Sequence, residues 1–172
     1  VFAKLVESNK AVTQKYLDNL RSIPYLGARL LIFSSDQDLS PYHWHNVNDL
    51  ELPFLVFINH TKLIDKQNYG NKYIYYMATY VPHDHELFTC DDKALEKVWF
   101  PSLKTIFPDF NAKKIHEKHF FRFANAQHIV GLNYAEKIPD KVTPLPNVYL
   151  SNFSQIFPED RGTNYAVRDG KA

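Results

Sequence analysis

The sequence predicts an α+β domain with a mixed or largely antiparallel sheet and flanking helices. The first half of the chain carries short β-branched and aromatic runs separated by polar turns, a pattern typical of strands. Residues 93–107 have the three- and four-residue spacing of apolar side chains that marks a helix. Further strand-like runs follow that helix, and strands around one interior helix favour the α+β class.

The N-terminal half is predicted to begin with a helix over residues 3–23. Its apolar stripe is strongest from Thr13, which is a suitable N-cap, and Pro24 ends the helix. The apolar run 26–35 then predicts a buried strand. Three further strands are expected before the second helix, at residues 42–47, 54–60 and 72–81.

The second half begins with the helix over residues 93–107, for which Asp91 or Asp92 is the expected cap. Pro101 lies inside this helix and is expected to kink or split it. Residues 115–124 are strand-like.

The remaining chain is predicted to be mostly irregular, because prolines punctuate it after residue 131. A short apolar strand is expected at residues 148–150. A polar turn follows, and a last helix begins near Gly162 or Thr163.

Composition limits the possible function classes. The 172 residues suffice for one ordinary domain, and 13 Phe with 11 Tyr provide a core with aromatic side chains to spare for a pocket or interface. With 20 basic and 19 acidic side chains the formal charge is only +1, and no basic block occurs. We therefore expect no nucleic-acid partner.

The chain carries no apolar run of about 20 residues, so no transmembrane segment is predicted, and no signal-peptide pattern opens it. Cys90 is the only cysteine, which excludes an internal disulfide and agrees with a cytoplasmic location. Val1 begins the chain, and Met77 is its only methionine. These features lead us to expect an internal fragment of a longer polypeptide.

The C-terminal segment carries the most specific pattern: a strand, a polar turn and a glycine-bearing loop that opens a helix. Gly162 permits close approach of the backbone to a ligand. The free amides and the positive dipole end at the helix start favour an anion, and Arg161 adds a charged donor. The alternative is an ordinary capped helix in which Asp160 and Arg161 form a surface ion pair.

This segment, NVYLSN at 147–152 and QIFPEDRGTNYAVRDG at 155–170, resembles the C-terminal flavin-binding signature of the amine oxidase and protoporphyrinogen oxidase superfamily. Weaker likenesses to the substrate domain of that superfamily occur in the same order, at residues 42–47, 53–61, 103–110 and 122–128. The resemblance covers residues 25–172. It implies a partial substrate-binding domain over residues 1–146, followed by the start of an FAD-contacting segment over 147–172.

The resemblance implies an FAD-dependent oxidoreductase that transfers a hydride from a carbon–nitrogen or carbon–carbon bond to the flavin. The helix start would stabilise negative charge on the reduced flavin. Catalytic residues are not assignable. The implied cofactor contacts are the backbone of Gly162, Thr163 and Asn164, with Ser151 and Asn152 near the ribityl or pyrophosphate group and Arg161 nearby.

The chain departs from the family pattern in three respects. Ser151 and Asn152 stand where the family usually has glycine and an acidic residue, which puts that contact in doubt. No cysteine lies near the loop, so a bound FAD would be non-covalent. The glycine-rich dinucleotide fingerprint is missing, so the N-terminal FAD domain is expected elsewhere in the same polypeptide. The fragment alone is therefore expected to be inactive and to bind FAD weakly or not at all.

The substrate-side candidates are His60, Tyr76 and Gln127, which would contact a small molecule. His60 ends a buried strand, where the alternative is a strand exit that reaches water. Other aromatic or polar residues are either pocket residues or ordinary core and edge positions: Tyr75, Tyr80, Tyr134, Tyr149 and Arg122.

Two further readings remain open. His43 with His45, and His83 with His85, have spacings that can chelate a metal, but nothing brings the two pairs together, and we predict no metal. A different function class is a non-enzymatic interaction domain with an aromatic-rich surface. If the FAD domain is missing, the apolar surface that it would cover predicts self-association of the fragment.

Overall fold

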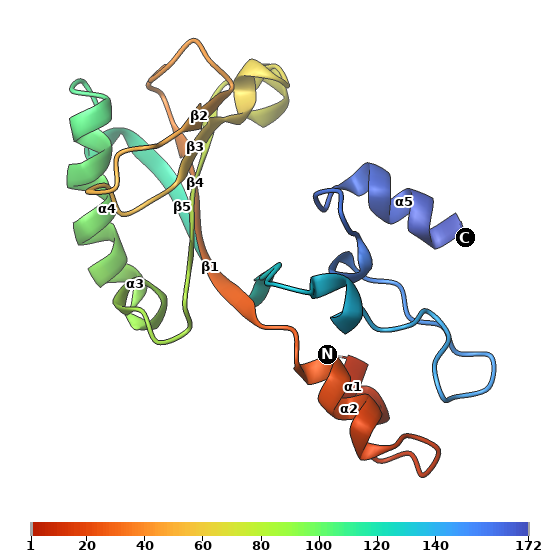
Figure 1. Ribbon diagram of the computed structural model, residues 1–172. Coiled ribbons are helices and arrows are strands. Elements are labelled where there is room, and N and C mark those ends of the chain that lie inside the picture. The colour runs from red at the N-terminus through yellow and green to blue at the C-terminus, as the bar shows by residue number, and fades with distance from the viewer. Residues whose placement is uncertain (1, 172) are drawn as a thin grey trace. The chain divides into compact units, whose positions relative to one another are not determined.

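The computed structural model describes residues 2–171. These residues form two compact units: one is Leu26–Gln127, and the other comprises the chain up to Tyr25 together with the chain from His128. The larger unit holds a sheet in the order β2-β3-β4-β1-β5, with helices α3 and α4 beside it (Figure 1). The predicted α+β class is confirmed. No helix among the described residues is both long and apolar enough to cross a membrane.

The sheet is antiparallel, as the strand-like runs of the sequence favoured. Its strands are β1 (Tyr25–Ser35), β2 (Trp44–Asn46), β3 (Val56–Asn59), β4 (Tyr73–Val81) and β5 (Ile115–His128). The pairs β1–β4, β2–β3 and β3–β4 all run antiparallel. At one end the Ser35 hydroxyl donates to the carbonyl of Lys114 at 3.0 Å, while at the other the amide of Ile129 donates to Pro24 at 2.9 Å. Strand β5 therefore runs opposite to β1.

Helix α4 (Asp92–Ile106) covers one face of the sheet. It begins at the predicted cap, where the Ala94 amide donates to Asp91 Oδ1 at 2.8 Å. Pro101 does not split the helix. Trp99 on α4 is fully buried, and its indole Nε1 donates to the Pro53 carbonyl at 3.1 Å. This bond joins the helix to the chain that leads into β3.

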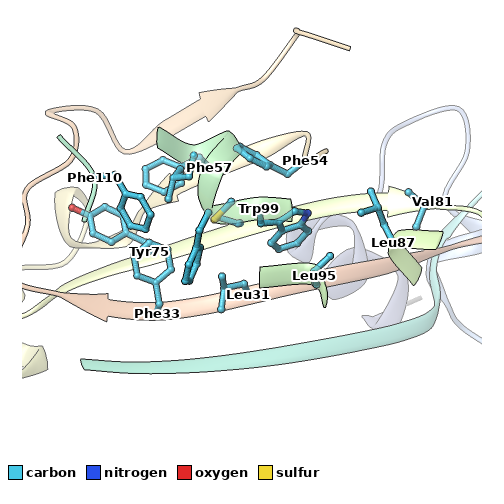
Figure 2. Packing of buried hydrophobic residues seen from close by; sticks show 13 residues of the cluster. Leu31, Phe33, Phe54, Phe57, Tyr75, Val81, Leu87, Leu95, Trp99 and Phe110 are labelled. Atoms are coloured by element: carbon cyan, nitrogen blue, oxygen red, sulfur yellow. The ribbon is translucent and has the colours of Figure 1, made fainter. Parts of the chain in front are cut away.

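The core of the larger unit lies between the sheet and α4. Alternate residues of β1, β3 and β4 point toward the helix, as the period of a strand requires. Figure 2 shows these side chains packed around Trp99. The cluster consists of Leu31, Phe33, Phe54, Phe57, Tyr75, Met77, Val81, Leu87, Leu95, Trp99, Phe100, Leu103 and Phe110.

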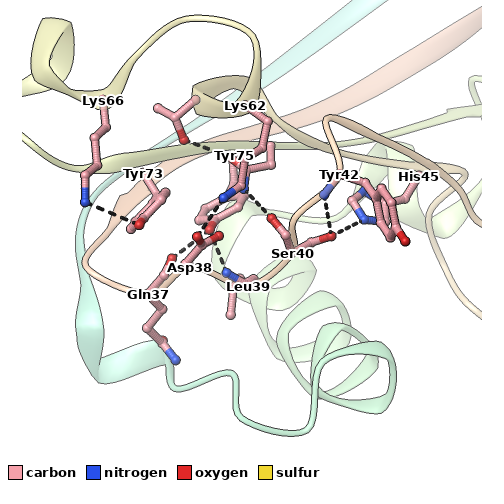
Figure 3. Close-up of polar contacts among 12 residues, drawn as sticks. Gln37, Asp38, Leu39, Ser40, Tyr42, His45, Lys62, Lys66, Tyr73 and Tyr75 are labelled. Atoms are coloured by element: carbon pink, nitrogen blue, oxygen red, sulfur yellow. Dashed lines mark hydrogen bonds and ion pairs between the residues drawn. The ribbon is translucent and has the colours of Figure 1, made fainter.

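The loop after β1 is fixed to this core by Tyr75. The hydroxyl of this buried residue donates to the carbonyl of Gln37 at 2.6 Å and accepts from the amide of Leu39 at 2.9 Å (Figure 3). Burial raises the pKa of Tyr75, so its hydroxyl remains a donor at neutral pH. Nearby, Ser40 Oγ lies 2.6 Å from Nε2 of His45. Tyr75 is thus a core residue, not part of a pocket wall.

The predicted helix over residues 3–23 is wrong as one element. The chain forms two helices, α1 (Phe2–Val6) and α2 (Gln14–Arg21). Between them the side chain of Asn9 accepts a hydrogen bond from the amide of Ala11 at 2.9 Å, a local bond that competes with the helix. The N-cap Thr13 is confirmed, since its side chain accepts from the Tyr16 amide.

Short helices complete the fold. The larger unit contains α3 (Glu86–Thr89), η1 (His60–Lys62), η2 (Lys66–Tyr69) and η3 (Ala112–Lys114), where η marks a 3-10 helix. The smaller unit contains η4 (Tyr134–Lys137), η5 (Phe153–Gln155) and α5 (Thr163–Lys171), besides α1 and α2.

The strand predicted at residues 148–150 is not formed. One isolated bridge pairs Val142 with Tyr149, and the Leu150 amide donates to Lys141 at 2.8 Å. The apolar run is too short to build a ladder there. The final helix is confirmed and begins at Thr163.

Candidate functional site

The face of the sheet opposite α4 carries a row of large side chains. Cross-strand pairing places Trp44 beside Ile58, Ile58 beside Tyr76, and Tyr76 beside Ile32. Strand alternation turns these four residues away from the buried core. We call this row the open face. Trp44 is 55% exposed, and the other three side chains are half-buried.

Two of the three predicted substrate-side residues meet at this face. The His60 ring lies 5.7 Å from the ring of Tyr76. His60 is the first residue of η1 and comes directly after β3. Its Nε2 lies 2.7 Å from the hydroxyl of Tyr69, the last residue of η2. The structure thus builds a polar corner, composed of His60 and Tyr69, at the edge of an apolar surface.

The sequence did not point to Tyr69, because this residue falls in a segment that reads only as a connection. Asp65 caps η2 by accepting from the amide of Gln67, and Gly70 ends it with a left-handed φ of 61°. These two signals predict a tight turn. They do not reveal that the turn folds back onto His60.

Gln127 does not join this corner. It is the last residue but one of β5, and it lies close to where the chain at Ile129 pairs with Pro24. Tyr76 pairs with Ile32, toward the other end of β1. Gln127 and His60 therefore lie at opposite ends of the sheet.

The C-terminal segment lies in the smaller unit and holds the residues predicted to contact a flavin. Asn152 caps η5: its Oδ1 accepts from the amide of Ser154 at 2.9 Å, while its own amide donates to Oε1 of Gln155 at 2.8 Å. The side chain of Asn152 is therefore already engaged in a capping box. Ser151 is exposed.

Helix α5 begins directly after Gly162. The Ala166 amide donates to the Gly162 carbonyl at 3.0 Å, so the amides of residues 163–165 precede the helical ladder. No acidic residue lies in the first turn of α5, where a carboxylate would otherwise compete for the positive end of the dipole. A Cβ at position 162 would come within 2.7 Å of the side-chain oxygen of Asn164. These features fit an electron-rich group at the helix start.

Charged groups surround this helix start and the buried His128. The carboxylate of Asp160 accepts from the Arg161 amide at 2.8 Å. His128 is only 4% exposed. Burial lowers the pKa of His128, the positive charge of Arg161 lowers it further, and Asp160 partly opposes both effects.

The histidine pairs considered as metal ligands make other contacts. His45 uses both ring nitrogens, with Nε2 near Ser40 Oγ and Nδ1 3.1 Å from the Phe57 carbonyl. His85 caps α3 by accepting from the Leu87 amide at 3.1 Å. Within residues 2–171, no three histidine, cysteine or acidic side chains gather as a metal site would require.

The other residues considered for a pocket wall occupy different places in the fold. Tyr134 is buried, whereas Tyr149 is 72% exposed. Tyr80, the last residue but one of β4, is 40% exposed. The guanidinium of Arg122 donates to the carbonyl of Cys90 at 2.6 Å, which ties β5 to the chain before α4.

The fold of this chain is similar to parts of two solved structures. A crystal structure of a candidate protoporphyrinogen oxidase from Exiguobacterium sp. matches 98% of this chain with a TM-score of 0.71 and 13% identity. An oxidoreductase from Methanosarcina mazei matches 86% of it with a TM-score of 0.59 and 12% identity. The expected likeness to the protoporphyrinogen oxidase fold is confirmed.

The chain spans 37% and 34% of the lengths of these two structures. No known protein family and no curated protein matches the chain by sequence. At 12–13% identity the likeness establishes the fold alone, because one fold can carry many different activities.

Proposed function

We propose that this chain is the substrate-side part of an FAD-dependent, amine oxidase-like oxidoreductase. One observation carries the proposal: nearly the whole chain superposes on about a third of a candidate protoporphyrinogen oxidase. A domain that occupies a third of such a protein need not contain the cofactor-binding fold itself. The glycine-rich dinucleotide motif would then be supplied by another part of the same polypeptide.

The open face is the proposed substrate surface. Its side chains Trp44, Ile58, Tyr76 and Ile32 offer a flat apolar wall, which suits the apolar body of a small molecule. The corner of His60 and Tyr69 at its edge offers hydrogen bonds that orient a polar end of that molecule. Gln127 lies too far along the sheet to share this corner and would contact a different part of the substrate.

The start of α5 is the proposed flavin contact. Flavin supplies a hydride acceptor, and hydride transfer from a carbon–nitrogen or carbon–carbon bond leaves negative charge on its ring system. The amides of Thr163 and Asn164, with Gly162 before them, favour that charge through the helix dipole. Arg161 adds a positive charge beside them.

Ser151 and Asn152 have a narrower proposed role. The Asn152 side chain already caps η5, so a contact with the cofactor would come from the exposed Ser151 hydroxyl or the backbone there. No cysteine lies near this loop in the sequence, so the proposed flavin is bound non-covalently. By itself the chain is proposed to lack activity, because it carries only one side of the site.

The test uses the longer polypeptide that contains this chain. We expect the purified protein to show flavin absorption bands, and Gly162→Val to lower the bound flavin by crowding Asn164 at the helix start. Gly170→Val is the matched control, since a side chain at position 170 meets no atom within 4 Å. A folded, colourless wild-type protein that takes up no added FAD would refute the proposal.

The alternative is a non-enzymatic interaction domain whose partner covers the open face. The exposed Trp44 favours this interpretation, because it extends a continuous apolar row, and contiguous apolar surface with aromatic side chains often marks an interface. A longer polypeptide that lacks flavin, and whose partner binding is lost on Trp44→Ala, would favour this alternative over the oxidoreductase.

A further inference from the structure

A column of aromatic rings lies beneath the segment that leads into α5. The ring of His128 stacks on that of Tyr134, with centroids 5.6 Å apart and planes at 24°. Tyr25 meets His128 edge-on at 6.3 Å, and Phe157 meets Tyr134 at 5.5 Å. The column joins the start of β1, the end of β5, η4 and the loop before α5.

Tyr134 holds this loop at two points. Its hydroxyl donates to the carbonyl of Ser154 at 2.6 Å, and both residues are buried. Its ring packs on Phe157, three residues further along. Burial raises the pKa of Tyr134, so the hydroxyl stays protonated and able to donate at neutral pH.

The carbonyl that accepts the hydrogen bond from Tyr134 belongs to Ser154, a residue that local hydrogen bonds already order. The amide and hydroxyl of Ser154 both donate to Asn152 Oδ1, at 2.9 and 2.6 Å. The bond from Tyr134 therefore fixes the same residue that the capping box orders. The chain from Phe157 to Gly162 then runs directly into α5, so a fixed Phe157 limits where the helix can begin.

We propose that Tyr134 is a positioning residue that fixes the loop before α5, and with it the amides proposed to face the flavin. The flavin part of this inference rests on the proposed function, whereas the loop part does not. A loop ordered before ligand binding costs less conformational entropy on binding. The hydroxyl of Tyr134 thus contributes to cofactor affinity without touching the cofactor.

The first measurement uses the 172-residue chain and needs no flavin. Tyr134→Phe removes the hydrogen bond and keeps the ring stack, and limited trypsin digestion reports opening of the loop through cleavage after Arg161. The loss of one buried hydrogen bond should raise the population of the opened loop about fivefold. The rate of cleavage after Arg161 should rise by the same factor. Cleavage at lysines within residues 26–127 is the internal reference.

Tyr149→Phe is the matched control. Tyr149 lies in the same unit, is largely exposed, and its hydroxyl bonds to no side chain or backbone group that the structure describes. Phe157→Ala is a second variant, which removes the ring contact but keeps the hydrogen bond to Ser154. It should also speed cleavage after Arg161. Equal cleavage of Tyr134→Phe and Tyr149→Phe, or faster cleavage at all sites, overturns the inference.

The second measurement uses the longer polypeptide and titrates it with FAD. Weaker binding by Tyr134→Phe, about fivefold, together with a shifted flavin spectrum supports the whole inference. Unchanged affinity and spectrum overturn its flavin part. Faster cleavage of Tyr134→Phe after Arg161, together with a wild-type longer polypeptide that binds no FAD, supports the loop clamp and sinks the proposed function instead.

Discussion

The guanidinium of Arg29, on β1, donates from Nη2 to the Asp92 carboxylate in the first turn of α4 at 2.7 Å. The Arg29 side chain is 2% exposed and that of Asp92 56%. The Nε atom of Arg29 is buried and has no hydrogen-bond partner within the described chain. This pair therefore joins the sheet to the start of its covering helix, and the arginine depends on one carboxylate.

Removal of the Asp92 carboxylate alone is expected to lower the free energy of unfolding more than removal of both members of the pair. Asp92→Ala leaves a buried guanidinium unpaired and should lower the free energy of unfolding by about 2 kcal/mol, less than a fully buried pair because Asp92 is half exposed. Arg29→Met in the same background should restore part of the loss. Urea denaturation measures both. A double variant less stable than Asp92→Ala would contradict the expectation.

Tyr75→Phe is expected to destabilise the larger unit by about 1–3 kcal/mol, because the Gln37 carbonyl and the Leu39 amide both lose their partner. Tyr73→Phe is the control. Its half-buried hydroxyl only accepts a 3.3 Å bond from Lys66. In thermal unfolding, the melting temperature of Tyr75→Phe should lie clearly below that of Tyr73→Phe. The reverse order would show that the loop contacts contribute little to stability.

Stability should depend on the protonation of His128. Its pKa in the folded chain lies below the ordinary value of 6.5, so the unfolded chain binds more protons between the two values. The contribution of the neutral His128 to the free energy of unfolding is fully present above the ordinary pKa. It is lost as the pH falls toward and through the lowered pKa of the folded chain. Melting temperatures from about pH 7.5 down to about pH 5.5 should fall for the wild type. His128→Gln should flatten this slope, while the exposed His119→Gln should keep it; equal slopes would exclude His128 as the cause.

If the proposed function is right, the polar corner of the open face should affect substrate binding in the longer polypeptide. Tyr69→Phe removes the 2.7 Å contact with His60 and should raise KM about fivefold with little change in kcat, because it frees the orienting imidazole. Tyr42→Phe is a suitable control, since Tyr42 lies on the loop before β2 and its ring packs against His45. An unchanged KM for Tyr69→Phe would remove this corner from the substrate site.

We also propose that the open face makes the isolated chain self-associate. Trp44→Lys should shift the mass measured by light scattering toward the monomer, because it places a charge in the apolar row. Val98→Lys changes an exposed apolar residue of α4 and should leave the mass unchanged. A wild-type chain that stays monomeric at high concentration would disprove the proposal.

The local elements were largely predictable because their signals lie within a few residues. A continuous apolar run marked β1, an aromatic and β-branched run marked β4, and the spacing of Leu95, Trp99 and Leu103 marked α4. The failures were also local. The side chain of Asn9 ended a helix that periodicity alone would have continued, and residues 148–150 were too few to form a strand.

By itself, the sequence determined the α+β class, the cap Thr13, a cap at Asp91 or Asp92, and the glycine at the start of α5. Only the tertiary structure decided that Tyr69 meets His60 and that His128 stacks on Tyr134. Caps and periodicity act through neighbouring backbone groups, so they can be read along the chain. Contacts between distant segments depend on strand order and on how turns fold back, and no run of neighbouring residues encodes these.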